Sequence, residues 1–410
     1  MMAYDAMIIG GGAAGLLAAC ALSRCGRRIV LLEKQGRVGR KLLSTGNGRC
    51  NLTNLNAAVG DYHGSRQAAQ AALRAFSPQK VLEFFETIGI PTVSDAEGRV
   101  YPMSRQAASV LDALRLCCDE AGVETVVDFP VVALKVLHED FEARALDGQR
   151  VRARCALVCT GGLAAPKLGG CGDGYRLLES FGHRIMPRFP AIAAVKTPTE
   201  DVRGLKGIRA EAEIGLIVDG DCLRVERGEV LFADYGISGI AVMQLARQAG
   251  EALRAGRICA LRLNFLPGVD ALPYLRQRAA KLPRRTMEDF LNGIVPKRLG
   301  QTLVRAAGIA STLTAEQLPA GALNRLAPLL GGWAVPVIGI QDFDQAQVTA
   351  GGASLKDFDL RCMQSLRVPG LFAAGEVLDV DGDCGGFNLQ WAWSSGLMAA
   401  EGMDNFLRER

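Results

Sequence analysis

The feature that most constrains this chain is a glycine triplet between an apolar run and a segment with helical spacing. Gly10, Gly12 and Gly15 follow the pattern G-x-G-x-x-G. They come directly after residues 4–9, which read as a buried strand, and they open residues 13–24, which read as a helix. A second apolar run follows and would complete a compact βαβ unit. The opening therefore predicts an α/β domain of the Rossmann type.

Each part of this motif has a physical task. Gly10 permits a tight turn, Gly12 lets the backbone approach a pyrophosphate, and Gly15 allows close helix packing. The helix start, including the N–H of Ala14, offers donors and a positive dipole end to phosphates. Glu33 ends the second apolar run and can accept hydrogen bonds from an adenosine ribose, where an acid disfavours a 2′-phosphate. The sequence therefore predicts a dinucleotide site.

Composition narrows the class of protein. With 410 residues, 49% apolar content and 22% charged residues, the chain is long enough for two or three globular domains. A net charge of +4 does not demand a nucleic acid partner. None of the twelve cysteines forms a C-x-x-C pair, which favours reduced thiols in a cytoplasmic protein. The three histidines lack ligand-like spacing, so we expect no metal site.

No segment has the character of a signal peptide or a membrane span. Residues 6–22 are apolar, but Asp5 precedes them, no basic region does, and three consecutive glycines interrupt them. We therefore expect a protein that is neither secreted nor bound to a membrane.

The pattern of apolar residues changes along the chain and predicts a divided domain. Strand and helix patterns continue to about residue 187, and residues 188–268 and 328–346 read as short β segments. Residues 269–327 read as helical, and residues 347–410 resemble the opening domain again. This order predicts a split domain with a β insert and a helical insert.

A second loop favours FAD over NAD as the dinucleotide. Residues 39–54 read GRKLLSTGNGRCNLTN and place small and polar residues where a loop could cover the pyrophosphate and reach a flavin. The alternative is a solvated basic loop. The candidate cofactor-binding residues in this loop are Arg40, Lys41, Thr45, Gly46, Asn47, Arg49 and Asn51. A further candidate is Lys34, which follows Glu33.

Five blocks, taken in order, resemble the bacterial NAD(P)/FAD-dependent oxidoreductases called the BaiN/RdsA or YhiN-like family, and they resemble the BaiN type most. They are GGGAAG, the loop at 39–54, TGG at 160–162 followed by GDGY at 172–175, LFADYGISG at 231–239, and the tail from Val348 to Gly396. The chain departs from the usual pattern at residues 169–171, where serine and threonine are more common.

The resemblance implies a Rossmann-type FAD domain interrupted by a small β-barrel and a small all-α domain. It also implies contacts of Gly375 and Glu376 with the ribityl or phosphate part of FAD. At a helix start, the isoalloxazine would contact Gly386, Asn388, Leu389 and Gln390. The adenine would contact Val132, and the residues that would pass close by are Thr160, Gly161 and Gly162.

The substrate site is less defined. Polar residues in loops near the expected flavin are Tyr101, Arg105, Tyr235, Asp379 and Asp381. Each could equally be a hydrogen-bonded structural residue, and the sequence assigns none as the catalytic acid. Cys50 and Cys384 lie in the flavin motifs, where packing is a better explanation than redox chemistry.

Three activities remain open. The family includes a reductase of conjugated double bonds in 3-oxo bile acids, a flavoenzyme that forms dihydrouridine in ribosomal RNA, and members labelled aminoacetone oxidase. We favour the first, with a small-molecule substrate. Because no second G-x-G-x-x-G follows a strand, NAD(P)H would bind only transiently as reductant.

Ribosomal RNA stays open as a partner because the helical insert is rich in basic residues. A solvated face explains them equally well, and aromatic residues for base stacking are sparse there. The basic residues are Arg276, Arg278, Lys281, Arg284, Arg285, Lys297, Arg298 and Arg305. The oligomeric state cannot be predicted from the sequence.

Overall fold

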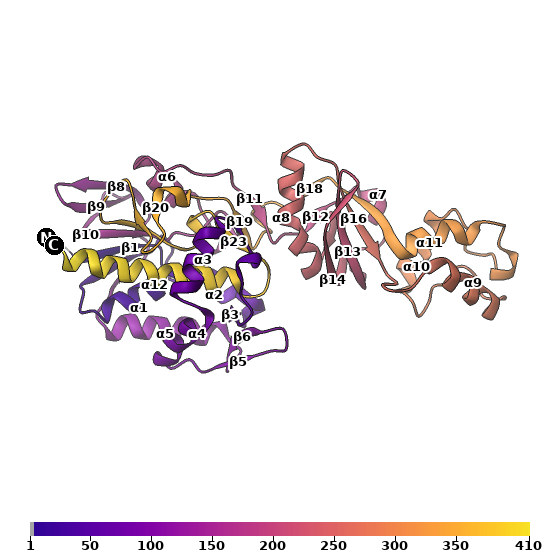
Figure 1. Ribbon diagram of the computed structural model, residues 1–410, viewed down its shortest axis with the longest axis horizontal. Helices are drawn as coiled ribbons and strands as arrows, with labels where there is room; N and C mark the ends of the chain where they lie inside the picture. The colour runs from indigo at the N-terminus through magenta and orange to yellow at the C-terminus, as the bar shows by residue number, and fades with distance from the viewer. Residues whose placement is uncertain (1–3) are drawn as a thin grey trace. The chain divides into compact units, whose positions relative to one another are not determined.

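The computed structural model describes residues 4–410, which divide into two compact units (Figure 1). The first unit comprises the described residues up to Phe189 together with Gln347–Arg410, and the second comprises Pro190–Ala346. The boundaries predicted from sequence, after residues 187 and 346, lie next to these divisions. Among residues 4–410, no helix has both the length and the apolar character needed to cross a bilayer.

A parallel sheet forms the centre of the first unit. Its strands run in the order β7-β2-β1-β10-β22, which is the order expected for a Rossmann-type domain. The strands are β1 (Tyr4–Ile9), β2 (Ile29–Leu32), β7 (Glu124–Val126), β10 (Arg150–Val158) and β22 (Leu371–Ala373). The strand order reverses between β1 and β10, and ligands of such sheets bind at that switch point. The predicted Rossmann-type fold is confirmed.

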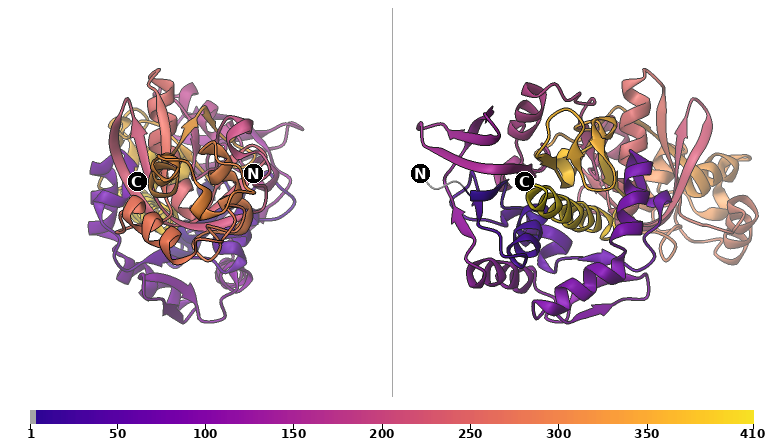
Figure 2. Two further views of the ribbon diagram at one scale, coloured as in Figure 1. Left: turned by 90° about the vertical axis from the view of Figure 1, so that its right-hand side faces the viewer. Right: turned by 60° about the vertical axis from the view of Figure 1, so that its left-hand side comes forward.

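Two helices from opposite ends of the chain lie side by side on this sheet (Figures 1 and 2). They are α1 (Ala13–Ser23) and α12 (Phe387–Arg408), and α5 (Ala107–Glu120) packs against α1. A Cβ on Gly396 would lie 2.8 Å from the carbonyl oxygen of Ala14, so glycine lets α12 approach α1 closely. Residues 371–408 therefore complete the domain that residues 4–32 begin.

Shorter elements surround this core. A meander of β8 and β9 extends the sheet from β10, β20 and β21 extend it beyond β22, and further short elements complete the unit. They are α2 (Arg40–Ser44), β3 (Thr53–Asn54), β4 (Tyr62–Gly64), α3 (Arg66–Ala75), α4 (Pro78–Thr87), β5 (Thr92–Ser94), β6 (Arg99–Pro102), β8 (Val131–Leu137), β9 (Asp140–Ala145), α6 (Asp173–Ser180), β11 (Phe189–Ala191), β19 (Val348–Ala350), β20 (Phe358–Asp359), β21 (Gln364–Ser365), the 3-10 turn η6 (Gly375–Val377) and β23 (Val380–Gly382).

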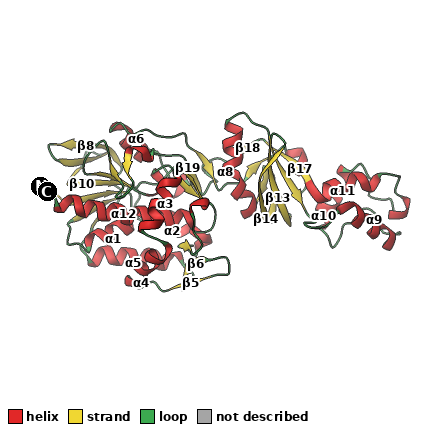
Figure 3. Ribbon diagram, viewed as in Figure 1, coloured by secondary structure: helices red, strands yellow, loops and turns green. Residues whose placement is uncertain are grey.

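The second unit contains a seven-stranded antiparallel sheet in the order β17-β16-β13-β14-β15-β12-β18, with helices around it (Figure 3). Its elements are β12 (Val195–Lys196), α7 (Thr199–Val202), β13 (Arg209–Val218), β14 (Asp221–Ala233), β15 (Gly236–Ser238), α8 (Ile240–Arg254), β16 (Cys259–Asn264), α9 (Ala271–Lys281), α10 (Lys297–Ala306), α11 (Ala322–Gly332), β17 (Trp333–Val337) and β18 (Gly339–Ile340).

The helical segment shares one apolar core with this sheet. Leu275, Leu299 and Leu326 from the helices belong to the same buried cluster as Ile214 and Phe232 from the strands. The structure therefore places the β insert and the helical insert in one compact unit.

Two element boundaries in the second unit differ from those that the sequence predicts. The sequence predicts short β segments in residues 188–268, whereas β14 is one continuous strand from Asp221 to Ala233 that pairs with β13 and then with β15. The helical insert does not end at residue 327, because α11 continues to Gly332 with Pro328 inside it. The helix tolerates this proline although it removes one backbone donor.

Candidate functional site

The glycine-rich loop joins β1 to α1, and protein backbone fills the space around two of its glycines. Gly10 has a φ of +113°, and a Cβ there would lie 2.6 Å from the carbonyl oxygen of Cys159. A Cβ on Gly15 would lie 2.0 Å from the carbonyl oxygen of Gly10. Any side chain at either position would collide with main-chain atoms, so both glycines are required by the fold itself.

Gly12 has a different environment, because a Cβ there would have no protein atom within 4 Å. It is the N-cap of α1, which has no side-chain cap and no acidic residue in its first turn. The first N–H groups of a helix have no partner within the helix, and the dipole makes this end attractive to anions. The N–H of Ala14 lies in this turn. An uncapped helix start beside open space fits a pyrophosphate.

Glu33 follows β2 with its carboxylate turned toward the same loop. Its Oε2 accepts a hydrogen bond from the Gly11 N–H, and its Oε1 accepts one from the Gln35 N–H, both at 2.8 Å. Each oxygen keeps a further lone pair, which ribose hydroxyls could use. Lys34 forms an ion pair with Asp173 at 2.8 Å. Burial raises the pKa of Asp173, but hydrogen bonds from Lys34 and Cys171 and the charges of Lys34 and Arg176 together outweigh burial and hold that pKa below its usual range.

The segment that leads into β8 lies against Glu33. The N–H of Phe129 donates to the Glu33 carbonyl at 2.9 Å, and the N–H of Asp128 donates to the Gln35 carbonyl at 3.1 Å. Val132 lies on β8 with its side chain largely exposed. The contact of Val132 with adenine stays a prediction. The hydrogen bonds of Asp128 and Phe129 hold the chain just before β8 beside Glu33, where the ribose is expected.

Three distant parts of the chain meet around Glu376. Its Oε2 pairs with Lys41 Nζ at 2.6 Å, and its Oε1 accepts the Thr349 N–H at 2.9 Å. The Thr349 hydroxyl accepts the N–H groups of residues 163 and 164 at 2.8 and 2.9 Å. A Cβ on Gly162 would lie 2.4 Å from that hydroxyl oxygen. Lys41, Gly162 and Glu376 were each predicted, and the structure brings them together.

Gly375 connects this group to the glycine-rich loop. It has a φ of +75°, and a Cβ there would lie 3.1 Å from the Cβ of Ala14 on α1. Its N–H donates to Ser395 Oγ at 2.9 Å, and its carbonyl accepts the Trp391 indole N–H at 3.0 Å. Two side chains of α12 therefore hold Gly375 beside the start of α1.

The basic residues of the second loop contact protein groups rather than solvent alone. Arg40 donates to the Gln35 side chain, and Arg49 lies over the Tyr101 ring with 5.5 Å between guanidinium carbon and ring centroid. Together with the ion pair of Lys41, these contacts disfavour the interpretation of a purely solvated basic loop.

The same loop turns sharply at its middle. Gly46 and Asn47 have φ values of +56° and +55°, and the Thr45 hydroxyl donates to the Leu42 carbonyl at 2.6 Å. This turn brings the backbone of Gly46 next to Asn51, whose N atom would lie 2.9 Å from a Cβ at residue 46. The left-handed turn therefore positions Asn51 near the start of α12.

Helix α12 begins at Gly386 without a side-chain cap and without an acidic residue in its first turn. A Cβ on Gly386 would lie 2.6 Å from the carbonyl group of Thr53 and 2.8 Å from Asn51 Oδ1. Asn388 accepts the Gly382 N–H at 2.9 Å and donates to the Gly382 carbonyl at 2.7 Å. Asn388 thus fixes the preceding loop to the helix, and the helix start remains a site suited to negative charge.

The next residues of α12 face inward. The Gln390 side chain is fully buried, accepts the Thr53 hydroxyl at 2.5 Å, and donates to the Phe76 carbonyl at 3.0 Å and to Ser394 Oγ at 2.8 Å. Only the backbone of Gln390 therefore remains for the expected flavin contact. Leu389 is half-buried and packs against the apolar core.

Three buried polar atoms near these loops have no hydrogen-bond partner within the protein: Asn51 Oδ1, Thr160 Oγ1 and the Tyr175 hydroxyl. Thr160 and Gly161 follow β10 directly, at the switch point of the sheet. Buried polar atoms are normally paired, so three orphaned atoms fit a polar ligand. Burial also raises the pKa of Tyr175. The residues present fit a dinucleotide such as FAD, and Tyr175 joins the candidates without having been predicted.

Two of the predicted substrate residues lie at β23, close to each other in the sequence. Asp379 and Asp381 flank Val380 of β23, and β23 pairs with β4 so that Asp381 lies opposite His63. His63 Nε2 lies 2.8 Å from Asp383 Oδ1, and both side chains are nearly buried. Sequence reasoning missed this pair because 320 positions separate its members, although both lie beside predicted motifs.

The other substrate candidates are dispersed. Tyr101 is almost fully buried beneath Arg49, and Arg105 is exposed with a φ of +52°. Tyr235 belongs to the second unit and is 43% exposed. Their roles stay predictions.

Cysteine and metal chemistry receive little support at this site. Cys50 is fully buried, and burial raises the pKa of its thiol to about 12, which agrees with packing rather than reactivity. Among residues 4–410, no group of three or more histidine, cysteine or acidic side chains is arranged to hold a metal ion.

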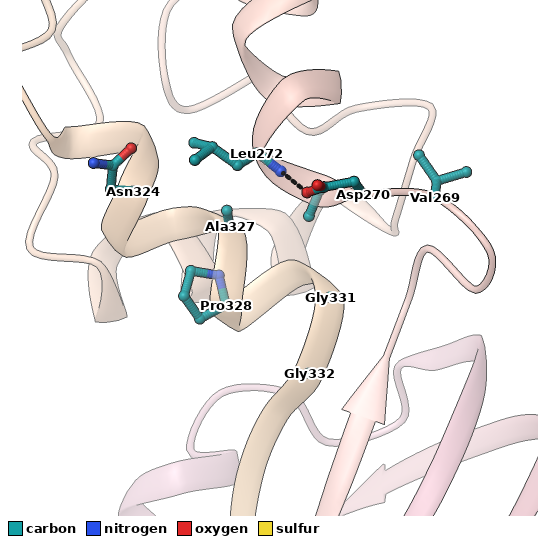
Figure 4. A pocket seen from close by; sticks show the side chains of 9 residues that line it. Val269, Asp270, Leu272, Asn324, Ala327, Pro328, Gly331 and Gly332 are labelled. Carbon is teal, nitrogen blue, oxygen red and sulfur yellow. Dashed lines mark hydrogen bonds between the residues drawn. The ribbon is translucent and has the colours of Figure 1, made fainter.

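The second unit contains a pocket between the start of α9 and the C-terminal half of α11 (Figure 4). Asp270 is the one charged residue among the nine that line it, and its carboxylate already caps α9 by accepting the Leu272 N–H at 3.1 Å. Asn324, Pro328 and two glycines complete one wall. This lining offers little to bind a charged ligand.

Several of the basic residues of the helical insert have structural roles. Arg278 donates to the carbonyls of Phe290 and Asn292 at 2.6 and 2.7 Å, and Arg298 donates to the Gly204 carbonyl. Lys297 pairs with Asp289 at 3.0 Å. These contacts weaken the interpretation of the insert as one continuous phosphate-binding face.

Known proteins resemble this chain along nearly its whole length. The family model described as HI0933-like protein Rossmann domain matches residues 4–402. The 3-dehydro-bile acid delta(4,6)-reductase of Clostridium scindens is 36% identical over 96% of this chain and 97% of its own length. A ribosomal RNA dihydrouridine synthase of Escherichia coli is 30% identical, over 98% of each chain.

Solved structures agree on the fold. The 3-ketosteroid delta1-dehydrogenase from Sterolibacterium denitrificans, in complex with 1,4-androstadiene-3,17-dione, superposes with a TM-score of 0.52. The match covers 99% of this chain and 100% of that one, at 14% sequence identity. At that identity the likeness concerns the fold alone.

Proposed function

The chain belongs to the HI0933-like family, and from that premise we propose that it is an FAD-dependent oxidoreductase that reduces a carbon–carbon double bond conjugated to a carbonyl. The substrate we propose is a small apolar enone of the 3-oxo steroid or bile acid type, and NAD(P)H is the reductant. Bound FAD supplies hydride transfer, which no amino-acid side chain provides.

The observation that carries the proposal is the pair of uncapped helix starts on one domain. Helix α1 begins at Gly12, and α12 begins at Gly386, ten residues before the glycine that packs on Ala14. At 1.5 Å per residue the two starts are separated by roughly 15 Å along α12. An extended dinucleotide can place its pyrophosphate at one helix start and its flavin at the other.

The residues around α12 have defined tasks in this proposal. The first N–H groups of α12 would stabilise negative charge at the flavin edge, and Asn388 keeps that helix start in place. The ion pair of Lys41 with Glu376 holds the second loop to the C-terminal segment, so that both segments border the proposed cofactor site. Substrate reduction also needs a proton donor, for which Tyr101, Asp379 and Asp381 remain candidates.

Two observations favour a small molecule over RNA. The bile acid reductase shares more of its sequence with this chain than the RNA-modifying relative does. In addition, Arg278, Lys297 and Arg298 already bind protein groups, which leaves fewer free cations for phosphates. Dihydrouridine formation in ribosomal RNA is therefore the second candidate, and both candidates share the chemistry of hydride addition to an enone-like double bond.

The test is anaerobic stopped-flow spectroscopy of the purified yellow protein. The flavin is reduced with NADH or NADPH, with dithionite as a separate reductant so that a wrong choice of nicotinamide does not hide the second half-reaction. The reduced protein is then mixed with a 3-oxo-Δ4,6-steroid or an unmodified ribosomal RNA fragment. Rapid reoxidation by the steroid supports the proposal, and reoxidation by RNA alone transfers the function to RNA modification.

Two further outcomes contradict the proposal. If oxygen reoxidises the flavin rapidly and neither substrate does, the protein is an oxidase, for which aminoacetone is the amine to try first. If the protein neither retains FAD nor regains it on reconstitution, the cofactor assignment itself is wrong.

A further inference from the structure

Three cysteines lie on two packed helices away from the cofactor loops. Cys20 lies on α1, and Cys117 and Cys118 lie on α5. The sulfur atoms of Cys20 and Cys118 are 3.5 Å apart, and both residues are buried in the interface of the two helices. Cys117 is half-buried and reachable from solvent. All three thiols are free.

Contacts across the two helices hold the buried thiols in place. The Cys20 thiol donates to the Leu114 carbonyl of α5 at 3.2 Å, and the Cys118 thiol lies 3.8 Å from the Leu16 carbonyl of α1. Each buried sulfur therefore contacts the opposite helix. The 3.5 Å between the two sulfur atoms exceeds the length of a disulfide bond by about 1.5 Å.

The thiols of Cys117 and Cys20 differ in pKa. Hydrogen bonding from Cys20 and the charge of Arg24 lower the pKa of the Cys117 thiol, against the effect of burial. Hydrogen bonds to Cys117 and Cys118, together with burial, raise the pKa of Cys20. The half-buried Cys117 thiol therefore loses its proton more readily than the buried Cys20 thiol. A reactive thiolate next to a resolving thiol is the arrangement that oxidation-sensitive sites use.

We propose that Cys117, Cys20 and Cys118 form an oxidation site at which hydrogen peroxide closes a disulfide between α1 and α5. The observation that carries it is the 3.5 Å separation of the buried Cys20 and Cys118 sulfur atoms across the helix interface, with the half-buried Cys117 next to Cys118 on α5. The site is independent of the proposed reductase activity.

The reaction balances with hydrogen peroxide as the oxidant. The Cys117 thiolate attacks one peroxide oxygen, the O–O bond breaks, and a sulfenic acid and hydroxide form. The Cys20 sulfur then attacks the sulfenic sulfur, an S–S bond replaces the S–O bond, and water leaves with the thiol proton. Two thiols and one peroxide thus become one disulfide and two waters. Cys118 can take over the bond to Cys20 by thiol–disulfide exchange, releasing the Cys117 thiol.

The disulfide would tie together the helices behind both cofactor loops. Helix α1 begins at the glycine-rich loop, and α5 supports the second loop, because a Cβ on Gly39 would lie 2.2 Å from the Leu111 side chain. Adjacent residues of a continuous helix point about 100° apart, so Cys117 and Cys118 are poorly placed to bond each other. The cross-link therefore joins α1 to α5 rather than α5 to itself.

The experiment is peptide mapping of the full-length, flavin-loaded protein after brief treatment with hydrogen peroxide and blocking of free thiols. Trypsin places Cys20 alone in residues 1–24 and the cysteine pair in residues 116–135. We expect these two peptides to become linked with the loss of two hydrogens. Cys222→Ser removes an exposed cysteine of the second unit and serves as the matched control.

Variants separate the roles of the three thiols. Cys117→Ser should slow formation of the cross-link at least about tenfold, while Cys222→Ser leaves its rate unchanged. Cys20→Ser should stop the reaction at a sulfenic acid on Cys117, which dimedone captures. In unmodified protein, iodoacetamide should alkylate Cys117 faster than Cys222 between pH 6 and 7, and this needs no variant.

Three results would overturn the proposal. The first is the absence of a link between the two peptides at peroxide concentrations that oxidise Cys222. The second is a cross-link that forms in Cys117→Ser at the rate of the unmodified protein. The third is equal alkylation rates of Cys117 and Cys222 across this pH range.

Discussion

The two units of the molecule use polar contacts differently. In the first unit, enclosed hydrogen bonds join residues far apart in sequence, such as Thr53 to Gln390 and the Trp393 indole to the Leu52 carbonyl at 2.9 Å. In the second unit, many ion pairs lie on the surface, as between Lys206 and Asp234. Both units have an apolar core, and in the first unit enclosed directional contacts also join the loops of the candidate site.

The largest expected effect comes from a comparison of two glycines in one loop of the first unit. Gly15→Ala forces a Cβ against the Gly10 carbonyl, so we expect a loss of stability of roughly 1–3 kcal/mol or more and loss of bound flavin. Gly12→Ala meets no protein atom and should keep the melting temperature while weakening FAD binding about tenfold. Thermal denaturation and flavin titration measure both. Equal melting temperatures for the two variants would contradict the assignment of their roles.

A buried hydroxyl provides the second test. Thr53→Val leaves Gln390 without its donor, and we expect a cost of about 1–2 kcal/mol in the free energy of unfolding by urea. The matched control is Thr302→Val on α10, where an exposed hydroxyl bonds the Arg298 carbonyl at 2.9 Å. The control should change stability by less than about 0.5 kcal/mol. Similar costs for both variants would remove the difference between the units.

An ion pair from each unit provides the third test. Lys41→Met breaks the half-buried pair with Glu376 and should destabilise the protein by about 1 kcal/mol, with faster release of flavin. Lys206→Met breaks an exposed pair and should change neither quantity measurably. Urea unfolding and flavin release in a stopped-flow fluorimeter report both. A larger effect at Lys206 would show that surface pairs hold the second unit together.

The smallest effect concerns pH. The pKa of Asp173 is lower in the folded protein than in the unfolded chain, because hydrogen bonds from Lys34 and Cys171 and the charges of Lys34 and Arg176 together outweigh burial. Its contribution to stability is therefore present above the unfolded pKa near 4 and is lost as pH falls through the folded value. Asp173→Asn should flatten the fall in melting temperature below about pH 4. If Asp173→Asn leaves the fall in melting temperature at low pH unchanged, other carboxylates dominate that loss of stability.

Sequence patterns predicted the first unit well where one segment determines its own structure. The strand at 4–9, the loop before α1 and the position of Glu33 after β2 agree with the structure, because spacing reports local geometry, and the roles of these residues toward a cofactor stay predictions. The contacts of Thr349 and the pair of His63 with Asp383 could not be predicted, since they depend on how distant loops meet. The inward direction of Gln390 likewise follows from packing that its own motif does not specify.

In the second unit, prediction failed at element ends. Pro328 marks a turn in most helices, but here tertiary packing carries α11 through it. The polar residues of β14 interrupt the apolar alternation, because one face of the hairpin meets solvent. The sequence therefore predicts short β segments where the structure has one long strand. Both errors arise where tertiary context overrides local preference.

The insertion of the second unit into the first has a consequence for synthesis on the ribosome. Strand β10 is synthesised long before its parallel neighbour β22, and α1 is synthesised even longer before α12, on which it packs. At 5–20 residues per second, the interval between β10 and β22 lasts roughly 10–40 seconds. During that time the nascent chain exposes an apolar sheet edge and one side of α1. Chaperone occupancy of ribosome-bound intermediates should therefore be highest before residues 371–408 have left the exit tunnel.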